Sequence, residues 1–209
     1  MIEATMARKS DTLVVRNKFY IITNGEQTEC NYFKLLKCKR SIYDVKILFE
    51  NADPLGLVKY AQNFLDEANQ VLCVFDIDET YKNGRLVPAL KQAEESGIKI
   101  AYSNVAFEVW LISHFEKCKL NLQLKDYARE LDRILNQNGK GERYTKNDEK
   151  LLKNCFLPNY RRAVENAKIV YQNYVKEHNE KNPNKRQPIW DWVSSTTVYK
   201  LVETLKLKD

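Results

Sequence analysis

Residues 71–79, Val-Leu-Cys-Val-Phe-Asp-Ile-Asp-Glu, restrict the fold of this chain more than any other segment. The apolar residues at its start, rich in β-branched and aromatic types, predict a short strand that is buried on both faces. Strands of this kind occur in parallel sheets covered by helices. The run ends on Asp76 and Asp78. Because these acids are two residues apart, both project from one side of the strand end, at the edge where open α/β sheets bind ligands.

A second acidic cluster, Glu26 and Glu29, follows the turn after an earlier predicted strand, residues 19–23. In a parallel sheet of the usual order, these acids converge with Asp76 and Asp78 on one edge. Close carboxylates repel each other unless a cation or a proton lies between them, and Mg²⁺ (or Mn²⁺) is the hard cation that such a group binds. Each acid taken singly also suits a helix start or an exposed strand end. Together they predict a metal site that cleaves phosphodiesters, with one carboxyl carrying a proton.

Strands alternate with helices along the first half of the chain. The predicted strands are 19–23, 45–49, 71–75 and 98–102, and the predicted helices between them are 31–37, 54–68 and 86–95. This alternation implies right-handed crossovers and a parallel sheet. After residue 104 the predicted elements are helices, at 106–117, 124–135, 148–156, 159–178 and 197–206. We therefore predict an α/β fold in which residues 1–104 form the sheet core and residues 105–209 form a helical elaboration packed on that core.

Composition narrows the class of protein. The chain has 209 residues, of which 44% are hydrophobic, and this is enough to bury a core. Its net charge of +6 is compatible with a nucleic-acid partner, although solubility alone also explains a modest lysine excess. Five scattered cysteines without a Cys-x-x-Cys pair argue against a zinc site or a disulfide framework. With no signal peptide and no apolar run near the ~20 residues of a membrane span, we expect a cytoplasmic protein that does not enter a membrane.

The acidic motif also allows a second enzyme class. Residues 76–80 spell the Asp-x-Asp-x-Thr motif of haloacid-dehalogenase-type phosphatases, in which the first Asp is a nucleophile and the second a general acid. Ser103, at the end of the next predicted strand, is available as the second motif of such an enzyme. However, the motif follows the third predicted strand instead of the first, and no later strand ends in a further acidic pair. The phosphatase hypothesis therefore ranks below metal-dependent phosphodiester cleavage.

Several other side chains have both a plain and a functional interpretation. His114 lies among aromatic residues and is predicted to be packed or hydrogen-bonded, whereas His178 lies in a polar segment and is predicted to be solvated. Lys146 follows a glycine-rich break, where a basic loop could reach a phosphate, although ordinary surface is the plainer interpretation. Trp190 and Trp192 could stack on a base, but anchoring of a loop on the core is the commoner use of such residues.

The chain resembles the RloB-like family, bacterial proteins with a Toprim-like catalytic core that are encoded near restriction and abortive-infection genes. The resemblance covers nearly the whole chain, in six blocks that occur in order: 25–33, 74–79, 103–116, 144–148, 163–168 and 195–202. It implies a Toprim-like sheet that binds Mg²⁺ and acts on nucleic-acid phosphodiesters, in RNA such as tRNA or in DNA, as part of anti-phage defence with a possible partner protein.

The same resemblance assigns roles to particular residues. Asp76 and Asp78 take the metal-ligand places directly. Glu108 falls in a family block just after the fourth strand, close enough to the same edge to join the metal shell. The resemblance, with the loop position of Lys146, makes Asn104 and Lys146 our candidates for contacts to substrate.

The first turn departs from the family. Members carry Glu-Gly there, and this chain has Asn24 before Gly25. An amide cannot transfer a proton as a carboxyl does, and it is a weaker metal ligand. Two alternatives follow. Either Glu26 or Glu29 substitutes for the missing carboxyl, or the protein is a binding or sensor subunit of a defence complex with reduced or lost catalysis.

Overall fold

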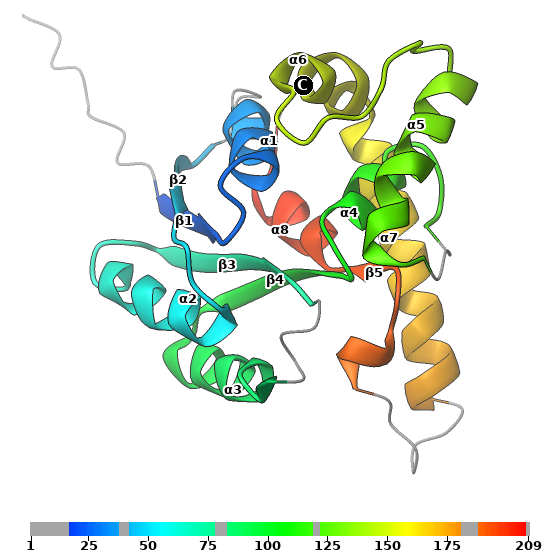
Figure 1. Ribbon diagram of the computed structural model, residues 1–209. Coiled ribbons are helices and arrows are strands. Elements are labelled where there is room, and N and C mark those ends of the chain that lie inside the picture. The colour runs from blue at the N-terminus through cyan, green and yellow to red at the C-terminus, as the bar shows by residue number, and fades with distance from the viewer. Residues whose placement is uncertain (1–16, 38–41, 78–82, 119–121, 181–187, 208–209) are drawn as a thin grey trace, which may run out of the picture.

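A computed structural model describes residues 17–37, 42–77, 83–118, 122–180 and 188–207 (Figure 1). Its centre is a five-stranded sheet with the order β2-β1-β3-β4-β5. The strands are β1 (Lys18–Thr23), β2 (Asp44–Phe49), β3 (Gln70–Asp76), β4 (Lys99–Asn104) and β5 (Ser195–Thr196). β1 to β4 run parallel, and β5 is antiparallel to β4. The predicted α/β fold with a mostly parallel sheet and a helical C-terminal region is confirmed.

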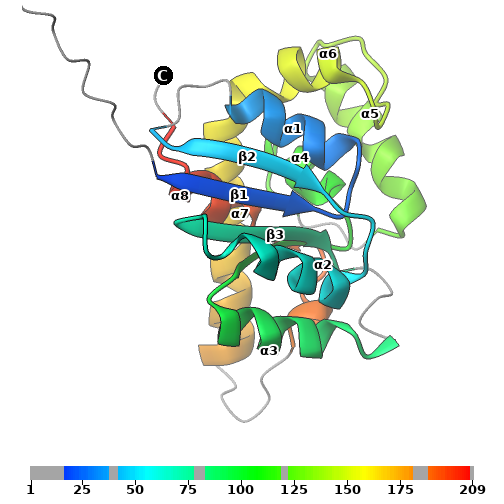
Figure 2. The ribbon, with the colours of Figure 1, turned by 90° about the vertical axis from the view of Figure 1, so that its left-hand side faces the viewer.

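Helices cover both faces of this sheet. They are α1 (Thr28–Lys37), α2 (Pro54–Ala61), α3 (Leu86–Ser96), α4 (Glu108–Ser113), α5 (Tyr127–Gln137), α6 (Glu149–Leu151), α7 (Tyr160–Tyr174) and α8 (Val198–Thr204). Figures 1 and 2 show α2 and α3 on one face and α1, α4 and α8 on the other, with α5, α6 and α7 in a further layer outside α4 and α8. The helices after residue 104 thus add material to one side of the sheet.

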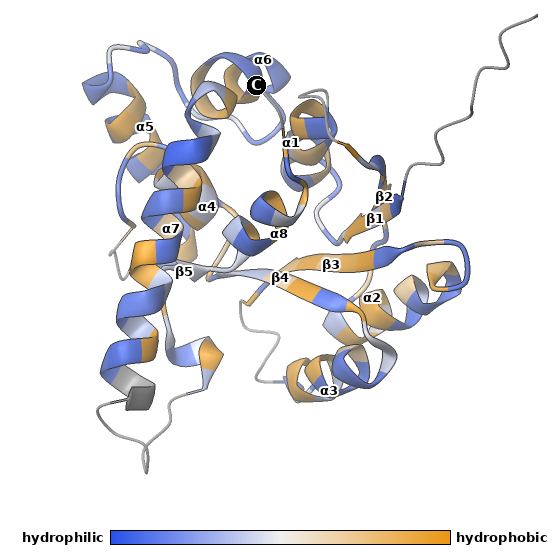
Figure 3. Cartoon of the chain, turned by 180° about the vertical axis from the view of Figure 1, so that it is seen from behind, coloured by the Kyte–Doolittle hydropathy of each residue, from blue (hydrophilic) through white to orange (hydrophobic). Residues whose placement is uncertain are grey.

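Alternation along the central strands divides the core into two layers. Phe19 and Ile21 of β1 pack into the cluster that contains α1, α4 and α8, whereas Tyr20 and Ile22 pack into the cluster that contains α2 and α3. Successive side chains of a strand point to opposite faces, so a strand buried on both faces needs an unbroken apolar run. Figure 3 shows this run as continuous hydrophobic colour along β3. The apolar sequence of β3 therefore places it inside the sheet, with its acidic end at the carboxyl edge.

Most differences from the sequence-based elements lie in the C-terminal half, but the helix predicted over 54–68 ends at Ala61 and is followed by a 3-10 turn over Gln62–Phe64. β5 was not predicted, and it adds an edge strand to the sheet from a segment far along the chain. The helix predicted over 106–117 is shorter, because α4 spans only Glu108–Ser113. The helices predicted over 148–156 and 159–178 each include a π-helical stretch, at Leu152–Phe156 and Val175–Glu180. Within the described ranges, no helix is both long and apolar enough to cross a bilayer.

Hydrogen bonds from buried hydroxyl groups hold β5 in place. The Thr196 hydroxyl donates to the Tyr102 carbonyl at 2.9 Å, and its oxygen lies 2.9 Å from the Ser103 hydroxyl oxygen. The Thr197 hydroxyl accepts from the Tyr102 amide at 2.9 Å. A buried hydroxyl needs such partners, because an unpaired polar group in the interior is unfavourable. The hydroxyl groups of Thr196 and Thr197 thus dock this segment on β4.

Candidate functional site

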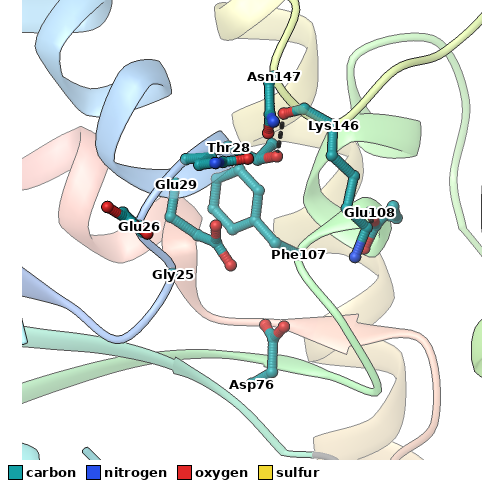
Figure 4. Close-up of a pocket in the computed structure, with 10 residues that line it drawn as sticks. Gly25, Glu26, Thr28, Glu29, Asp76, Phe107, Glu108, Lys146 and Asn147 are labelled. Atoms are coloured by element: carbon teal, nitrogen blue, oxygen red, sulfur yellow. Dashed lines mark hydrogen bonds and ion pairs between the residues drawn. The ribbon is translucent and has the colours of Figure 1, made fainter. Parts of the chain in front are cut away.

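A pocket of about 280 Å³ opens at the carboxyl edge of the sheet, where β1 and β3 end (Figure 4). This is the edge at which parallel α/β sheets bind ligands. The residues that line it are Gly25, Glu26, Gln27, Thr28, Glu29, Asp76, Phe107, Glu108, Lys146 and Asn147. Four of these are acids, so the pocket gathers carboxylates from the β1 turn, the end of β3 and the start of α4.

Glu29 enters the pocket from the first turn of α1. Its carboxylate folds back over Gly25, so closely that a Cβ atom built on Gly25 would lie only 2.0 Å from Glu29 Oε2. Figure 4 shows this carboxylate pointing toward Asp76. Asn24 is half-buried and does not line the pocket. The Glu29 carboxyl therefore lies beside Gly25, and the residue before Gly25, Asn24, carries an amide.

Asp76 is the last residue of β3, and its half-buried side chain points into the pocket toward Glu29 (Figure 4). Glu26 behaves differently, because its side chain is exposed and its carboxylate points away from Asp76 (Figure 4). Asp78, the second predicted metal ligand of this strand end, lies outside the described residues. Of the two acids predicted at the β1 turn, the structure brings only Glu29 toward Asp76.

Glu108 forms the wall opposite the β1 turn. It starts α4, and only 5% of its surface is exposed. Its Oε1 atom accepts a hydrogen bond from the Tyr144 hydroxyl at 3.1 Å and lies 3.4 Å from Lys146 Nζ. The Thr28 hydroxyl donates to the backbone carbonyl of Lys146. These contacts hold residues 144–146 against the pocket. Sequence reasoning gave no role to Thr28 or Tyr144, although both fall in blocks shared with the family.

The electrostatics of the pocket favour a bound cation or proton. Burial is the main cause that raises the pKa of Glu29 above its ordinary value. A hydrogen bond from its own backbone amide opposes this effect, the charge of Glu108 raises the pKa further, and Lys146 lowers it. A carboxyl that is desolvated next to another carboxylate gains from any positive charge that reaches it.

The donor set fits a hard divalent cation in part. Glu29 and Asp76 face each other with carboxylate oxygens, the ligand type that Mg²⁺ and Mn²⁺ prefer. Glu108 already has Tyr144 and Lys146 as partners. Within the part of the chain that the structure describes, no three His, Cys, Asp or Glu side chains form a ready metal-binding group. The described residues therefore offer two facing ligands and one acid that is held by a lysine.

Asn104 and the tryptophans do not reach the pocket lining. Asn104 is buried, and its side-chain amide donates to the backbone carbonyls of Ile189 at 3.0 Å and Trp190 at 2.9 Å. Trp192 is buried and stacks on Tyr174, with ring centroids 5.8 Å apart and planes inclined by 6°. These side chains fix the segment that leads into β5. The Asn104 side chain thus holds this segment in the structure, and its contact to substrate stays a prediction.

His114 is a packed core residue, as the plain interpretation predicted. It is completely buried, and its Nε2 atom lies 3.0 Å from the Tyr32 hydroxyl while Nδ1 lies 3.0 Å from the Trp110 carbonyl. Since a carbonyl only accepts, Nδ1 carries the proton and Nε2 accepts from Tyr32. Burial lowers the pKa of His114 to about 4, so the ring is neutral near pH 7. The side chain of His178 lies outside the described residues.

Comparison with known proteins gives one result for this chain. The family model described as RloB-like protein matches residues 19–205, from β1 to beyond the end of α8. The match therefore includes every residue that lines the pocket. Searches of curated proteins and of solved structures found no significant match.

Proposed function

We propose, from the premise that the chain belongs to the RloB-like family, that it is a Mg²⁺- or Mn²⁺-dependent nuclease that cleaves nucleic-acid phosphodiesters in anti-phage defence. The observation that carries this proposal is the position of Glu29, whose carboxylate folds over Gly25 toward Asp76. This position supports Glu29 as the substitute for the carboxyl that the family carries at the position of Asn24. The spacing of Asp76 and Asp78 in the sequence supports Asp78 as a further ligand.

Each acid of the pocket has a role in the proposed reaction. Asp76 and Asp78 would hold the cation, which when bound neutralises charge on the attacking and leaving oxygens of the displacement. Glu29 would either complete this shell or, with its carboxyl not bound to the cation, carry a proton. A buried carboxyl with a raised pKa exchanges protons closer to neutral pH than an exposed one does. Glu29 is therefore our candidate to take the proton from the attacking hydroxyl or water. Glu108, which pairs with Lys146 in the structure, would be a further ligand when the cation is bound.

A binding or sensor subunit without turnover is the second candidate function. Two observations favour it: Asn24 replaces the carboxyl of the family, and the described residues hold no ready three-ligand metal group. The phosphatase hypothesis has less support. Ser103, which it would use as a second motif, is buried and within hydrogen-bonding distance of the Thr196 hydroxyl.

Cleavage of end-labelled tRNA and of linear DNA, with Mg²⁺ or Mn²⁺ and with EDTA as the blank, tests the proposal. We expect metal-dependent cleavage that falls about 100-fold or more in Asp76→Asn and Glu29→Gln, because each removes a charge from the site. Glu94→Gln, on the exposed surface of α3, is the matched control and should keep the full rate. Glu26→Gln in the same series shows which of the two acids of the first turn, Glu26 or Glu29, cleavage requires.

The possible outcomes separate the hypotheses. Cleavage that survives Asp76→Asn unchanged would belong to a contaminant and would contradict the proposed site. Metal-dependent binding of nucleic acid without cleavage, in a preparation that also contains its defence partner, would favour the sensor subunit. Release of phosphate from monoesters in place of internal cleavage would favour the phosphatase.

A further inference from the structure

Among the described residues that line the pocket, Lys146 is the single basic side chain, and it lies among four acids. Its ammonium nitrogen is 3.4 Å from Glu108 Oε1. The two partners differ in environment, because the Lys146 side chain is 68% exposed whereas that of Glu108 is 7% exposed. The ammonium therefore approaches a nearly buried carboxylate from the solvent side of the pocket.

The backbone of this segment is anchored independently of the lysine side chain. The Thr28 hydroxyl donates to the Lys146 carbonyl, and the Tyr144 amide donates to Asp132 Oδ1 at 2.6 Å. Neither contact involves the side chain of Lys146. The four-carbon stem can consequently change its direction while the loop stays in place, since lysine is a flexible side chain that ends in a point charge.

We propose that Lys146 is a resident counterion that a divalent cation displaces from the acidic pocket, and that the displaced ammonium then binds a non-bridging phosphate oxygen of the nucleic acid. The inference rests on the proposed function and adds an order of events to it. The ammonium end of this pair is exposed to solvent, which weakens its attraction to the carboxylate, so the ammonium can exchange. A divalent cation carries twice its charge and interacts more strongly with several carboxylates at once. Lysine is also a common ligand of phosphate.

This exchange couples the two ligands of the site. When the cation frees Lys146 for the phosphate, each ligand raises the affinity for the other, and by linkage the two factors are equal. Without the lysine, the cation should bind more tightly by itself, because nothing competes for Glu108. The same substitution should weaken the cooperation between cation and nucleic acid. These two effects have opposite signs, and general damage to the site would not produce both.

Direct titration with Mn²⁺, followed by electron paramagnetic resonance of the free ion, measures the first effect without any activity assay. We expect Lys146→Met to bind Mn²⁺ up to about fivefold more tightly than the native protein, since an ion pair whose ammonium is exposed to solvent contributes about that factor. Lys150→Met, which removes the same charge from an exposed position outside the pocket lining, is the matched control. Its Mn²⁺ affinity should equal that of the native protein.

The second measurement uses a fluorescein-labelled single-stranded RNA with Ca²⁺ or with EDTA. Ca²⁺ should raise RNA affinity more in the native protein than in Lys146→Met. Equal or weaker Mn²⁺ binding by Lys146→Met, or an equal effect of Ca²⁺ on RNA binding in both proteins, would overturn the exchange and leave the proposed nuclease standing. If Mn²⁺ does not bind the native protein, or binds Asp76→Asn equally well, the metal site itself is wrong and both proposals fail.

Discussion

Gly25→Ala tests whether the Glu29 carboxylate must lie where the structure shows it. A methyl group at this position would lie 2.0 Å from Oε2 and 2.4 Å from Oε1 of Glu29. Both separations are far inside van der Waals contact, so the carboxylate has to leave its place over the turn. Gly25 is not among the residues with positive φ, so alanine introduces no backbone strain there. The substitution therefore moves one carboxylate and removes no titratable group.

The effects on stability and on activity should differ widely in size. The group that must move is the end of a flexible side chain, and an unfavourable rotamer costs about 0.5–1.5 kcal/mol. Replacing glycine also restricts the unfolded chain, which opposes this loss by about 0.4–1 kcal/mol. For a chain of this size the net change in Tm is then within about 4 °C. Loss of a positioned proton carrier lowers a rate by about 10²–10⁴-fold. We expect cleavage to fall at least about 100-fold in a protein that melts almost normally.

The measurement is a double-mutant cycle of initial cleavage rates on labelled RNA, with Tm taken from calorimetry. If alanine at position 25 acts by displacing Glu29, then Gly25→Ala combined with Glu29→Gln should be no slower than Glu29→Gln alone. A full rate in Gly25→Ala would refute the reasoning, because the carboxylate position would then be irrelevant. A further 100-fold loss in the double variant would refute it too, since Gly25 would have a role independent of Glu29.

Three further predictions concern pH and packing. Burial raises the Glu29 pKa, so the charged form of Glu29 destabilises the fold above its unfolded pKa, and stability falls as pH rises. By calorimetry, Glu29→Gln should therefore raise Tm at pH 7.5 but not at pH 4. A rise in Tm at pH 4 and none at pH 7.5 would contradict burial as the cause. Burial lowers the His114 pKa to about 4, so its stabilising neutral state is lost as pH falls from about 6.5 toward 4. Urea unfolding should show about 3 kcal/mol of this acid sensitivity in the native protein and none of it in His114→Gln. Thr196→Val removes a hydroxyl that donates to a buried carbonyl of β4 and contacts the Ser103 hydroxyl, so urea unfolding should show a loss of about 1–3 kcal/mol in the free energy of unfolding. The control Thr204→Val, at an exposed hydrogen bond, should change this free energy by under about 0.5 kcal/mol.

The sheet could be predicted because its signals are local. The apolar run at 71–75 predicts a strand by itself, and the observed β3 is Gln70–Asp76. The helix predicted over 86–95 is α3, Leu86–Ser96, and Gly97 ends it with a left-handed φ of 71°. The edge that carries Asp76 then follows from the parallel arrangement of the strands. Each of these features depends on residues close together in sequence.

The features that were not predicted depend on distant partners. Ser195 and Thr196 carry no apolar alternation, and β5 exists because buried groups of β4 bond to it. Glu26 and Glu29 were equivalent candidates by sequence, and they differ because only Glu29 is placed to fold back over Gly25. The contact of Tyr144 with Glu108 joins residues 36 positions apart, which no local pattern indicates. Sequence therefore supplied the acids of the site but not their neighbours.

The two-residue strand β5 also affects how the chain reaches its folded state. Ser103 and Thr196 are 93 residues apart, so the β4 edge has no partner until a further 93 residues have been synthesised. An open strand edge can pair with another chain, and partly folded intermediates that expose one are prone to aggregate. Closing so long a loop also slows folding, because the chain loses entropy before the contact forms. The shortest of the described strands consequently covers the carboxyl end of the β4 edge, at Ser103 and Asn104.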